Sequence, residues 1–429
     1  MRFSIAKESI TPDWSTLMGG YSARKLRSTG VQDEIYARAL MLDDKRGKVL
    51  IISLEIVFVM RDFASKVKKK IEEKYGLKEE NILISSVHTH SAPSTYSLAR
   101  APYLHPEPPE EKFMEFLEEK IMKCVEDCMS AGQEGQMEVG KGETYIGMNR
   151  RQKTDHGIEL APNPEGPVDR DLFVIAVKDP EGNVKSVLYS CACHPTVLDY
   201  DNLDITGDFV SPACREIEKR YPGSTAIFMQ GACGDINPAT KAGNTEHRQT
   251  YFSDIEFTGK VLANDVYNVI RCGMEKVDLL IRVSLESIML PLGECKVHLL
   301  QDRMSKDNAI YEKYKPYVET VLKRMQEGYF NGGVSFLVGI MELSSKVRMI
   351  TLEGEVCQGI GTDIKYLYGS GYTIISGYSN GVVSYIPTRN IIKEGGYEDY
   401  ISYMGYGLPG SFDEGVEETI TRNIKERME

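Results

Sequence analysis

Two strand-helix-strand patterns limit the folds that this chain can adopt, because the two apolar strands of each pattern must lie in a sheet that the connecting helix covers. The strand, helix and strand cover residues 48–53, 62–75 and 81–87 in the first pattern, and 184–193, 212–220 and 225–229 in the second. Such alternation favours an α/β fold with helices on the faces of its sheets. We therefore predict layered, mixed β-sheets flanked by helices in a single domain, residues 1–429, which could have internal halves at about 1–180 and 181–429.

The rest of the chain continues the alternation of strands and helices. Helical patterns cover residues 251–271, 307–326 and 414–427, and strand-like runs cover 277–291, 347–352 and 373–378. The proline-rich segment at residues 94–109 follows the first pattern. Its length is typical of a lid over a site, although an ordinary surface loop is the alternative.

Three of the seven histidines follow predicted strands: His88 and His90 come after the strand at 81–87, and His194 ends the strand at 184–193. Ligands of α/β sheets gather at the carboxyl ends of strands. In extended chain, His88 and His90 would share one face, so that one ring can bind a metal while the other binds substrate. A single such histidine could be structural, but three together favour a metal site, since neutral imidazole is a common zinc ligand.

Several short motifs occur in a fixed order from Met18 to Glu398. They are Met18-Gly19-Gly20-Tyr21, His88-Thr89-His90-Ser91-Ala92-Pro93, Asn149-Arg150, His194-Pro195-Thr196, Gly207-Asp208-Phe209, the Gly-x-Cys-Gly-Asp-x-x-Pro run at 231–238, Leu352-Glu353-Gly354-Glu355, Tyr385-Ile386-Pro387-Thr388-Arg389 and Gly396-Tyr397-Glu398. In these motifs the chain resembles the neutral/alkaline, non-lysosomal ceramidases. The resemblance covers nearly the whole chain and implies their fold.

The resemblance also implies a catalytic zinc site and the groups around it. The four expected ligands are His88, His194, Glu355 and Tyr385. Three further residues, His90, Arg150 and Tyr397, are expected around the activated water and the substrate carbonyl, where a cation and a phenol can donate hydrogen bonds to a developing oxyanion. For Glu355, capping of the following helix is the alternative, because carboxylates are favoured at helix amino termini.

The chain departs from the ceramidase pattern at Asn237. Ceramidases carry Gly-Asp-x-Ser-Pro, with the serine at the reaction centre, whereas this chain reads Gly234-Asp235-Ile236-Asn237-Pro238. Asn237 has no hydroxyl, so a serine acyl-enzyme route through this position is excluded. A route through zinc-activated water remains, because it needs no serine. The Asn237 amide, the fourth residue of the predicted catalytic set, points to recognition of a polar head group.

Composition favours a soluble enzyme that acts on a small molecule. The 51 basic and 63 acidic residues give a net charge of -12, which disfavours nucleic acid as a partner. The amino terminus has no apolar signal segment and no later run is long enough to span a membrane, so we expect a cytoplasmic protein without stable membrane insertion. Ceramidases, by contrast, are typically exported or membrane-associated and continue into an immunoglobulin-like domain. The oligomeric state leaves no mark in the sequence.

The nine cysteines include no Cys-x-x-Cys pair. An odd count of this kind argues against a disulfide framework. We expect the pairs Cys124 and Cys128, and Cys191 and Cys193, to be reduced and buried as small apolar side chains.

These observations predict a zinc-dependent hydrolase that cleaves the amide of an N-acyl compound by means of zinc-activated water. The missing signal segment and Asn237 favour a small soluble substrate over membrane ceramide. Two alternatives remain open at this point. The chain could be a non-catalytic ligand-binding relative, as the lost serine would allow, or an esterase, because the same site would polarise an ester carbonyl.

Overall fold

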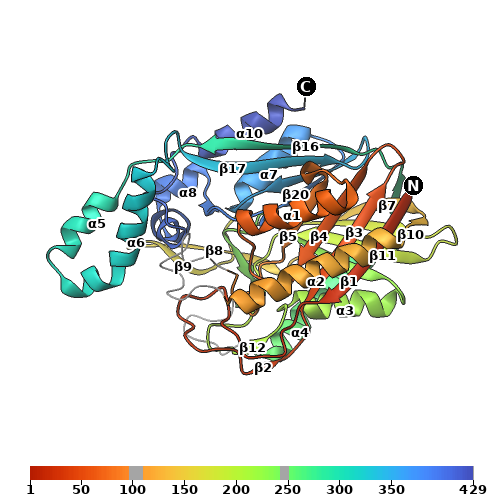
Figure 1. Ribbon diagram of the computed structural model, residues 1–429, viewed down its shortest axis with the longest axis horizontal. Coiled ribbons are helices and arrows are strands. Elements are labelled where there is room, and N and C mark those ends of the chain that lie inside the picture. Colours follow the sequence, from red (N-terminus) through yellow and green to blue (C-terminus); the bar gives the residue numbers. More distant parts are fainter. Residues whose placement is uncertain (96–109, 242–250, 429) are drawn as a thin grey trace.

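Three β-sheets face a common apolar core, and each carries helices on its outer face (Figure 1). The computed structural model describes residues 1–95, 110–241 and 251–428. Most of the predicted lid at 94–109 and its side chains Tyr96, Arg100, Tyr103 and His105 therefore lie outside the described residues. The mixed α/β architecture predicted from the sequence is confirmed.

The first sheet has the strand order β5-β4-β3-β1-β6. Its strands are β1 (Arg2–Ser9), β3 (Tyr36–Asp43), β4 (Lys48–Leu54), β5 (Ile82–Ser86) and β6 (Gln133–Glu134). The helices α1 (Arg61–Tyr75) and α2 (Glu111–Ser130) pack on its outer face (Figure 1). Strands β4 and β5 are parallel and are joined through α1, so the first predicted strand-helix-strand unit is confirmed.

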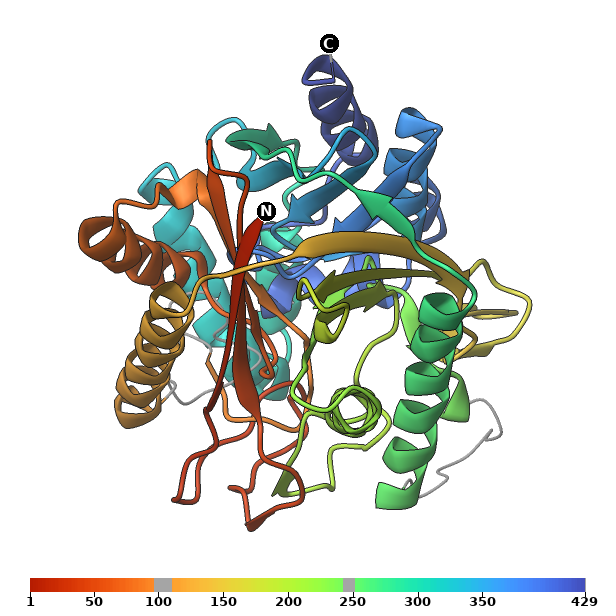
Figure 2. The ribbon, with the colours of Figure 1, turned by 90° about the vertical axis from the view of Figure 1, so that its right-hand side faces the viewer.

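The second sheet has the order β13-β11-β10-β7-β15. Its strands are β7 (Gln136–Glu143), β10 (Asp171–Lys178), β11 (Val184–Cys191), β13 (Thr225–Gln230) and β15 (Glu275–Val277). The helices α3 (Val210–Arg220) and α4 (Phe252–Arg271) cover it, and Figure 2 shows α4 on the opposite flank of the molecule from α1 and α2. Strands β11 and β13 are parallel and joined through α3, which confirms the second unit.

The third sheet has the order β16-β17-β18-β20. Its strands are β16 (Arg282–Leu290), β17 (Val334–Glu342), β18 (Val347–Leu352) and β20 (Tyr372–Ser376). Four helices of this part are α5 (Val297–Met304), α6 (Asn308–Gln326), α7 (Gln358–Tyr368) and α10 (Val416–Glu426). Helices α7 and α10 lie against the sheet, whereas α5 and α6 form a helical pair at one end of the molecule (Figure 1).

Alternation along the strands builds the common core between the three sheets. In β4, Val49 and Ile51 face this core, while Leu50 and Ile52 face the helices α1 and α2. Successive side chains of a strand point to opposite faces, so a strand apolar at every position is buried on both faces. The apolar run read from the sequence as a buried strand therefore occupies a central layer.

Short elements complete the fold around the ends of the strands. They are β2 (Gly30–Val31), β8 (Gly147–Thr154), β9 (Gly157–Asn163), β12 (Asp204–Ile205), β14 (Ile236–Pro238), β19 (Glu355–Val356), β21 (Tyr385–Ile386), η1 (Glu79–Asn81), η2 (Ala239–Lys241), α8 (Arg389–Glu394), η3 (Tyr397–Ile401) and α9 (Ser402–Gly405). Three of them, β14 and the paired strands β19 and β21, lie in the candidate site described below.

The predicted helix bounds agree with the structure to within about two residues, the usual uncertainty of helix ends. The predicted helix at 307–326 begins after Asp307, whose carboxylate accepts hydrogen bonds from the backbone N–H groups of Ala309 and Ile310. The strand predicted at 277–291 is wrong at its start, because β15 ends at Val277 and β16 begins only at Arg282. The two segments pair with different sheets.

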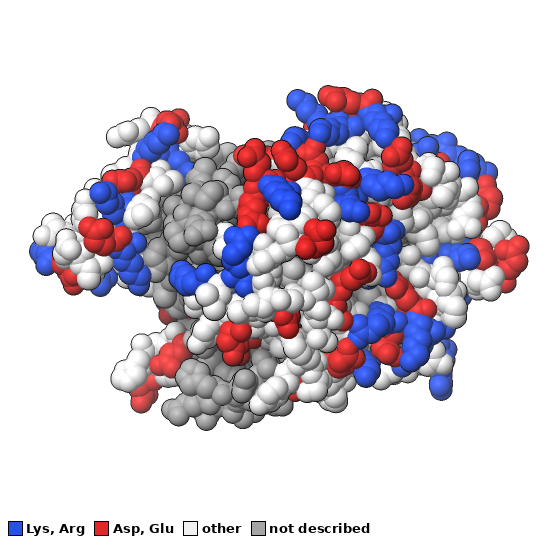
Figure 3. Space-filling view, turned by 60° about the horizontal axis from the view of Figure 1, so that its bottom comes forward, with Lys and Arg blue, Asp and Glu red and all other residues white. Residues whose placement is uncertain are grey.

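Both cysteine pairs singled out in the sequence are buried and carry free thiols, as expected. On the face seen in Figure 3, acidic and basic side chains are interspersed. Within the described residues, no helix has the length and apolar character needed to cross a membrane.

Candidate metal centre and active site

His88 lies just beyond β5, where two backbone carbonyls hold its main chain and its ring. Its backbone N–H donates to Ile56 (3.0 Å), and its ring Nδ1 lies 2.8 Å from the carbonyl oxygen of Val57. A carbonyl oxygen only accepts, so Nδ1 carries a ring proton and the other nitrogen, Nε2, faces Glu355. The φ angle of His88 is 71°, in the left-handed region. The extended chain expected at His88 is therefore wrong, although the predicted strand end is correct.

His194 follows β11 and is fixed in the same manner. Its backbone N–H donates to the carbonyl oxygen of Ile236 (3.0 Å), and its ring Nδ1 lies 3.0 Å from the same oxygen. The side chain is fully buried, and Nε2 has no hydrogen-bond partner within the described part of the chain. Burial and the Arg150 guanidinium lower the pKa of His194 to about 4, so the ring is neutral at neutral pH.

The carboxylate of Glu355 lies against both of these Nε2 atoms. Its Oε2 is 3.2 Å from His88 Nε2 and 3.5 Å from His194 Nε2. Burial raises the pKa of this carboxyl group, but the two imidazoles lower it more strongly, to well below its usual value. Glu355 belongs to the short strand β19, and the helix cap of α7 is Cys357. The alternative that Glu355 caps the following helix is therefore wrong.

Tyr385 lies beside Glu355 in the parallel pair of β19 and β21, in which the two residues are partners. Its side chain is buried, and the Arg150 guanidinium lies 5.4 Å from its ring centroid. Burial raises the pKa of the Tyr385 phenol, and Glu355 raises it further. The structure thus brings three of the expected ligands, His88, His194 and Glu355, into contact and places the fourth, Tyr385, beside Glu355.

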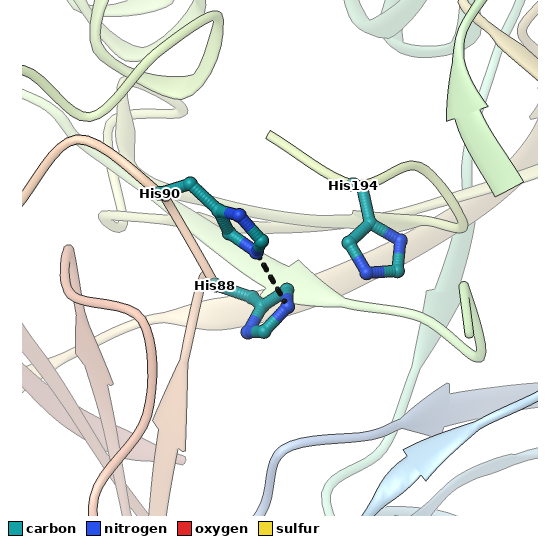
Figure 4. Close-up of side chains that lie close together, drawn as sticks. All are labelled: His88, His90 and His194. Carbon is teal, nitrogen blue, oxygen red and sulfur yellow. Dashed lines mark hydrogen bonds between the residues drawn. The ribbon is translucent and has the colours of Figure 1, made fainter. Parts of the chain in front are cut away.

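His90 lies as close to the two other histidines as a ligand would. Its Nε2 is 3.1 Å from His88 Nε2, and ring nitrogens of His88, His90 and His194 all lie within 4.8 Å of one another (Figure 4). Gly20 supports this ring, because a Cβ at Gly20 would lie 2.4 Å from His90 Cγ. The ring of Tyr21 also packs edge-on against His90 (4.7 Å). The motif at residues 18–21 therefore shapes the site.

These residues fit a metal ion. Two imidazoles present their Nε2 atoms, each oriented by a backbone carbonyl on Nδ1, as is usual for histidine ligands. A carboxylate completes a set of nitrogen and oxygen donors of the kind that zinc accepts. The buried Nε2 of His194 would otherwise remain an unsatisfied polar atom, which is costly in a protein interior.

Arg150 joins the metal-binding residues to the loop at residues 231–238, which contains Gly234 and Asp235 and is called the Gly-Asp loop below. Its Nε donates to Glu398 Oε1 (2.9 Å) and its Nη1 to Asn237 Oδ1 (3.2 Å). The guanidinium also lies 5.6 Å from the ring centroid of Tyr397. Burial raises the pKa of Tyr397 to about 12, with a further contribution from Glu355, so this phenol keeps its proton and can donate. The predicted catalytic residues Arg150, Tyr397 and Asn237 therefore form one cluster.

Sequence reasoning missed two tyrosines that bind Glu355. Tyr378 donates from its hydroxyl to Oε2 (3.2 Å), and Tyr406 donates to Oε1. Tyr378 is the last residue of the strand predicted at 373–378, and a position at a strand end is a usable sequence signal for a residue of the site. Tyr406 lies outside every motif and element predicted from the sequence, so no sequence signal indicates its role. Glu398, which also pairs with Arg151 (2.6 Å), stood in a quoted motif without an assigned role.

Comparison with known proteins places the chain in a family. The model of the neutral/alkaline non-lysosomal ceramidases, N-terminal part, matches residues 5–258. The chain belongs to this ceramidase family. It is 24% identical over 250 residues to the neutral ceramidase of Pseudomonas aeruginosa, a match that covers 55% of this chain and 37% of that protein. The neutral ceramidase of Drosophila melanogaster is 23% identical over 239 residues, covering 51% of this chain and 33% of that protein. The aligned region thus spans about a third of these relatives.

Solved ceramidase structures have the same fold. The crystal structure of the neutral ceramidase from Pseudomonas aeruginosa superposes with a TM-score of 0.77 at 16% identity, covering 99% of this chain and 73% of that chain. A structure described as ceramidase complexed with C2 gives a TM-score of 0.79 at 16% identity, with 99% and 74% coverage. The fold predicted from the resemblance is confirmed for nearly the whole chain.

Proposed function

We propose that the protein is a zinc-dependent hydrolase that cleaves the amide of a small, soluble N-acyl compound. One observation carries this proposal: the Nε2 atoms of His88 and His194 converge on the carboxylate of Glu355, while backbone carbonyls hold both Nδ1 atoms. Membership of the ceramidase family supports amide hydrolysis. Tyr385, the strand partner of Glu355, would be the fourth ligand.

A bound zinc ion supplies a Lewis acid that polarises a carbonyl and activates water. Arg150 and Tyr397 would donate hydrogen bonds to the carbonyl oxygen, since Arg150 is buried and Tyr397 partly buried, and both lie beside Tyr385. His90 would accept and return the proton. Burial and the two neighbouring imidazoles lower the pKa of His90 well below its usual value, so its ring is neutral, as a proton acceptor must be.

The proposal of a small, polar substrate rests on Asn237. This residue accepts a hydrogen bond from Arg150 at the position where ceramidases carry their serine. An amide there can bind polar groups but cannot serve as a nucleophile. A soluble N-acyl compound therefore suits the site better than ceramide does.

Metal analysis together with an activity panel tests the proposal. We expect one zinc per chain in the purified protein, and release of free amine from some members of a panel of N-acyl compounds. Ceramide and matched esters belong in the panel, because they separate the lipid and esterase alternatives. Chelation should abolish turnover and added zinc should restore it. A protein that neither carries zinc nor takes it up on dialysis would refute the proposal.

A non-catalytic binding protein is the second candidate, and the missing serine hydroxyl at Asn237 favours it. In that case the purified protein would carry zinc and bind N-acyl compounds without turnover. Measurement of binding in parallel with activity separates the two functions.

A further inference from the structure

Asn237 and Arg150 lie on one face of the small sheet formed by β8 and β14. Asn237 is the register partner of Met148, and Arg150 follows two residues later on the same strand. In an antiparallel pair such diagonal neighbours share a face and reach each other. The contact between Arg150 Nη1 and Asn237 Oδ1 (3.2 Å) is this diagonal pair.

The chemistry of arginine decides which way the Asn237 amide is turned. A guanidinium has only donors, so Arg150 requires the amide oxygen to face it. The amide nitrogen then points away from Arg150 with two N–H donors. Within the described residues, Asn237 Nδ2 has no hydrogen-bond partner, and the residue is only partly buried.

Arg150 has unused donors as well. Its side chain is 5% exposed, and Glu398 holds its Nε (2.9 Å). Its Nη2 is buried and no acceptor among the described residues has hydrogen-bond geometry to it, although the Tyr385 phenol lies close enough to the guanidinium to raise the pKa of Arg150. The same Glu398 also pairs with Arg151 (2.6 Å), so its negative charge is shared between two guanidinium groups. An unpaired buried donor of this kind is costly unless a ligand satisfies it.

The backbone next to Asn237 places these donors beside the metal-binding residues. The carbonyl oxygen of Ile236 accepts from both the backbone N–H and the ring Nδ1 of His194 (3.0 Å each). A group bound at Asn237 is therefore a near neighbour of the His194 ring. The Arg150 guanidinium that would hold the scissile carbonyl oxygen also reaches Asn237, so its remaining N–H groups and the Asn237 amide are within reach of a substituent next to the scissile amide.

We propose that Asn237 and Arg150 form a carboxylate-binding pair that selects substrates with an anionic oxygen group next to the scissile amide. A carboxylate offers two acceptor oxygens, and it matches a guanidinium N–H together with an amide N–H. An ammonium group, which only donates, would meet donors and a positive charge. The inference rests on the proposed function and names N-acyl amino acids, or half-amides of dicarboxylic acids, as its substrate class.

A matched pair of ligands tests the inference without turnover. The probes are a γ-keto acid, in which a methylene replaces the scissile N–H of an N-acylglycine, and its neutral primary amide. Calorimetry on the metal-loaded protein should show that the acid binds about tenfold to a hundredfold more tightly, as expected for hydrogen bonds to a charged group. Turnover is then compared within two pairs of substrates. The first pair is the N-acylglycine and the corresponding N-acylglycinamide, and the second is a half-amide with its carboxylate on the acyl side and the corresponding diamide. In each pair the ratio of kcat/KM for the acid to kcat/KM for the neutral compound is the measurement.

Asn237→Asp should abolish this preference. The new carboxylate can still accept from Arg150, but it presents an oxygen instead of N–H donors to the ligand. The matched control is Asn264→Asp, because Asn264 accepts from Arg220 in an exposed pair between α4 and α3. The control should keep the wild-type preference for the acid.

Two results would overturn the inference: equal binding of the acid and the amide by the wild-type protein, or an acid preference that survives in Asn237→Asp. Acid-selective binding that depends on Asn237, without any turnover, would support the inference while the proposed function fails. Turnover of neutral and acidic amides at equal efficiency would support the function and refute the inference.

Discussion

At the scale of single residues, two backbone carbonyls decide which imidazole nitrogens face the candidate metal centre. Val57 holds Nδ1 of His88, and Ile236 holds Nδ1 of His194. Both rings are thereby restricted to one tautomer and one orientation before any metal binds. Because such preorganisation strengthens metal binding, we expect the two histidines to dominate the affinity of the site.

We predict that His194→Ala loses both the metal and the activity. The substitution leaves His88, Glu355 and Tyr385, which lie on separate segments and would hold zinc too weakly to survive purification. Metal content by mass spectrometry and turnover of N-acyl compounds are the measurements. His298→Ala is the matched control, because His298 lies on the exposed helix α5. A metal-loaded His194→Ala protein would remove His194 from the ligand set.

We predict that His90→Ala keeps its metal and loses most of its rate. His90 is assigned to proton transfer, and a residue outside the ligand set typically changes affinity or activity by about 10–100-fold instead of abolishing metal binding. Its Nε2 lies 3.1 Å from His88 Nε2, so the structure would also allow His90 as a ligand. If His90→Ala purified without metal while His88→Ala retained zinc, the two roles would have to be exchanged.

At the scale of elements, the Gly-Asp loop joins β13 to the segment that carries Glu355. The backbone N–H of Gly234 donates to the Val356 carbonyl (2.9 Å), and Asp235 Oδ1 accepts from the Gln358 backbone N–H (2.7 Å) at the start of α7. The carboxylate thus satisfies a free N–H group of the helix amino terminus. The loop sets the position of β19, and with it Glu355, relative to the second sheet.

We predict that Gly234→Ala destabilises the protein and weakens metal binding. A Cβ at Gly234 would lie 2.7 Å from the Glu355 carbonyl oxygen and 3.0 Å from the Cys357 nitrogen, so backbone must move. Overpacking of this kind costs about 1–3 kcal/mol of unfolding free energy. Denaturant unfolding and zinc titration measure the two effects.

Gly47→Ala is the control for this change, because its Cβ would only reach ordinary contact with Ile281 (3.7 Å). Equal stability and zinc affinity in Gly234→Ala and the wild-type protein would contradict the role given to the loop.

At the scale of the whole molecule, the candidate metal centre draws at least one residue from each of the three sheets. His88 follows β5 of the first sheet, His194 follows β11 of the second, and Glu355 follows β18 of the third. The sheets otherwise meet through the apolar core that they share. A metal ion would therefore connect all three sheets at one point.

We predict that chelation lowers the melting temperature of the wild-type protein. A ligand that binds only the folded state stabilises it by about 4 kcal/mol at a concentration a thousandfold above Kd. The His194→Ala protein should melt at the same temperature with and without chelator. A wild-type melting temperature that does not respond to chelation and zinc addition would contradict a metal link between the sheets.

The local sequence determined many of the elements and the positions of His88 and His194 after strands. Both strand-helix-strand units, the start of α6 after Asp307 and the placement of His88 and His194 after strands follow from patterns within a few residues. These features depend on alternation, helix caps and strand ends, which are short-range properties of the chain. The conformation of His88 itself was not predictable, because contacts with Ile56 and Val57 hold it at a positive φ.

Only the tertiary structure decided how the site is connected. The bonds from Tyr378 and Tyr406 to Glu355, and from Arg150 to Asn237 and Glu398, join segments that are far apart in sequence. Such contacts depend on the packing of three sheets against one core, which no local pattern encodes. The resemblance to ceramidases named most of these residues, but the directions of their hydrogen bonds come from the packed chain. For the same reason, the direction in which the Asn237 amide N–H groups point could be recognised only from the contact between Arg150 and the Asn237 oxygen.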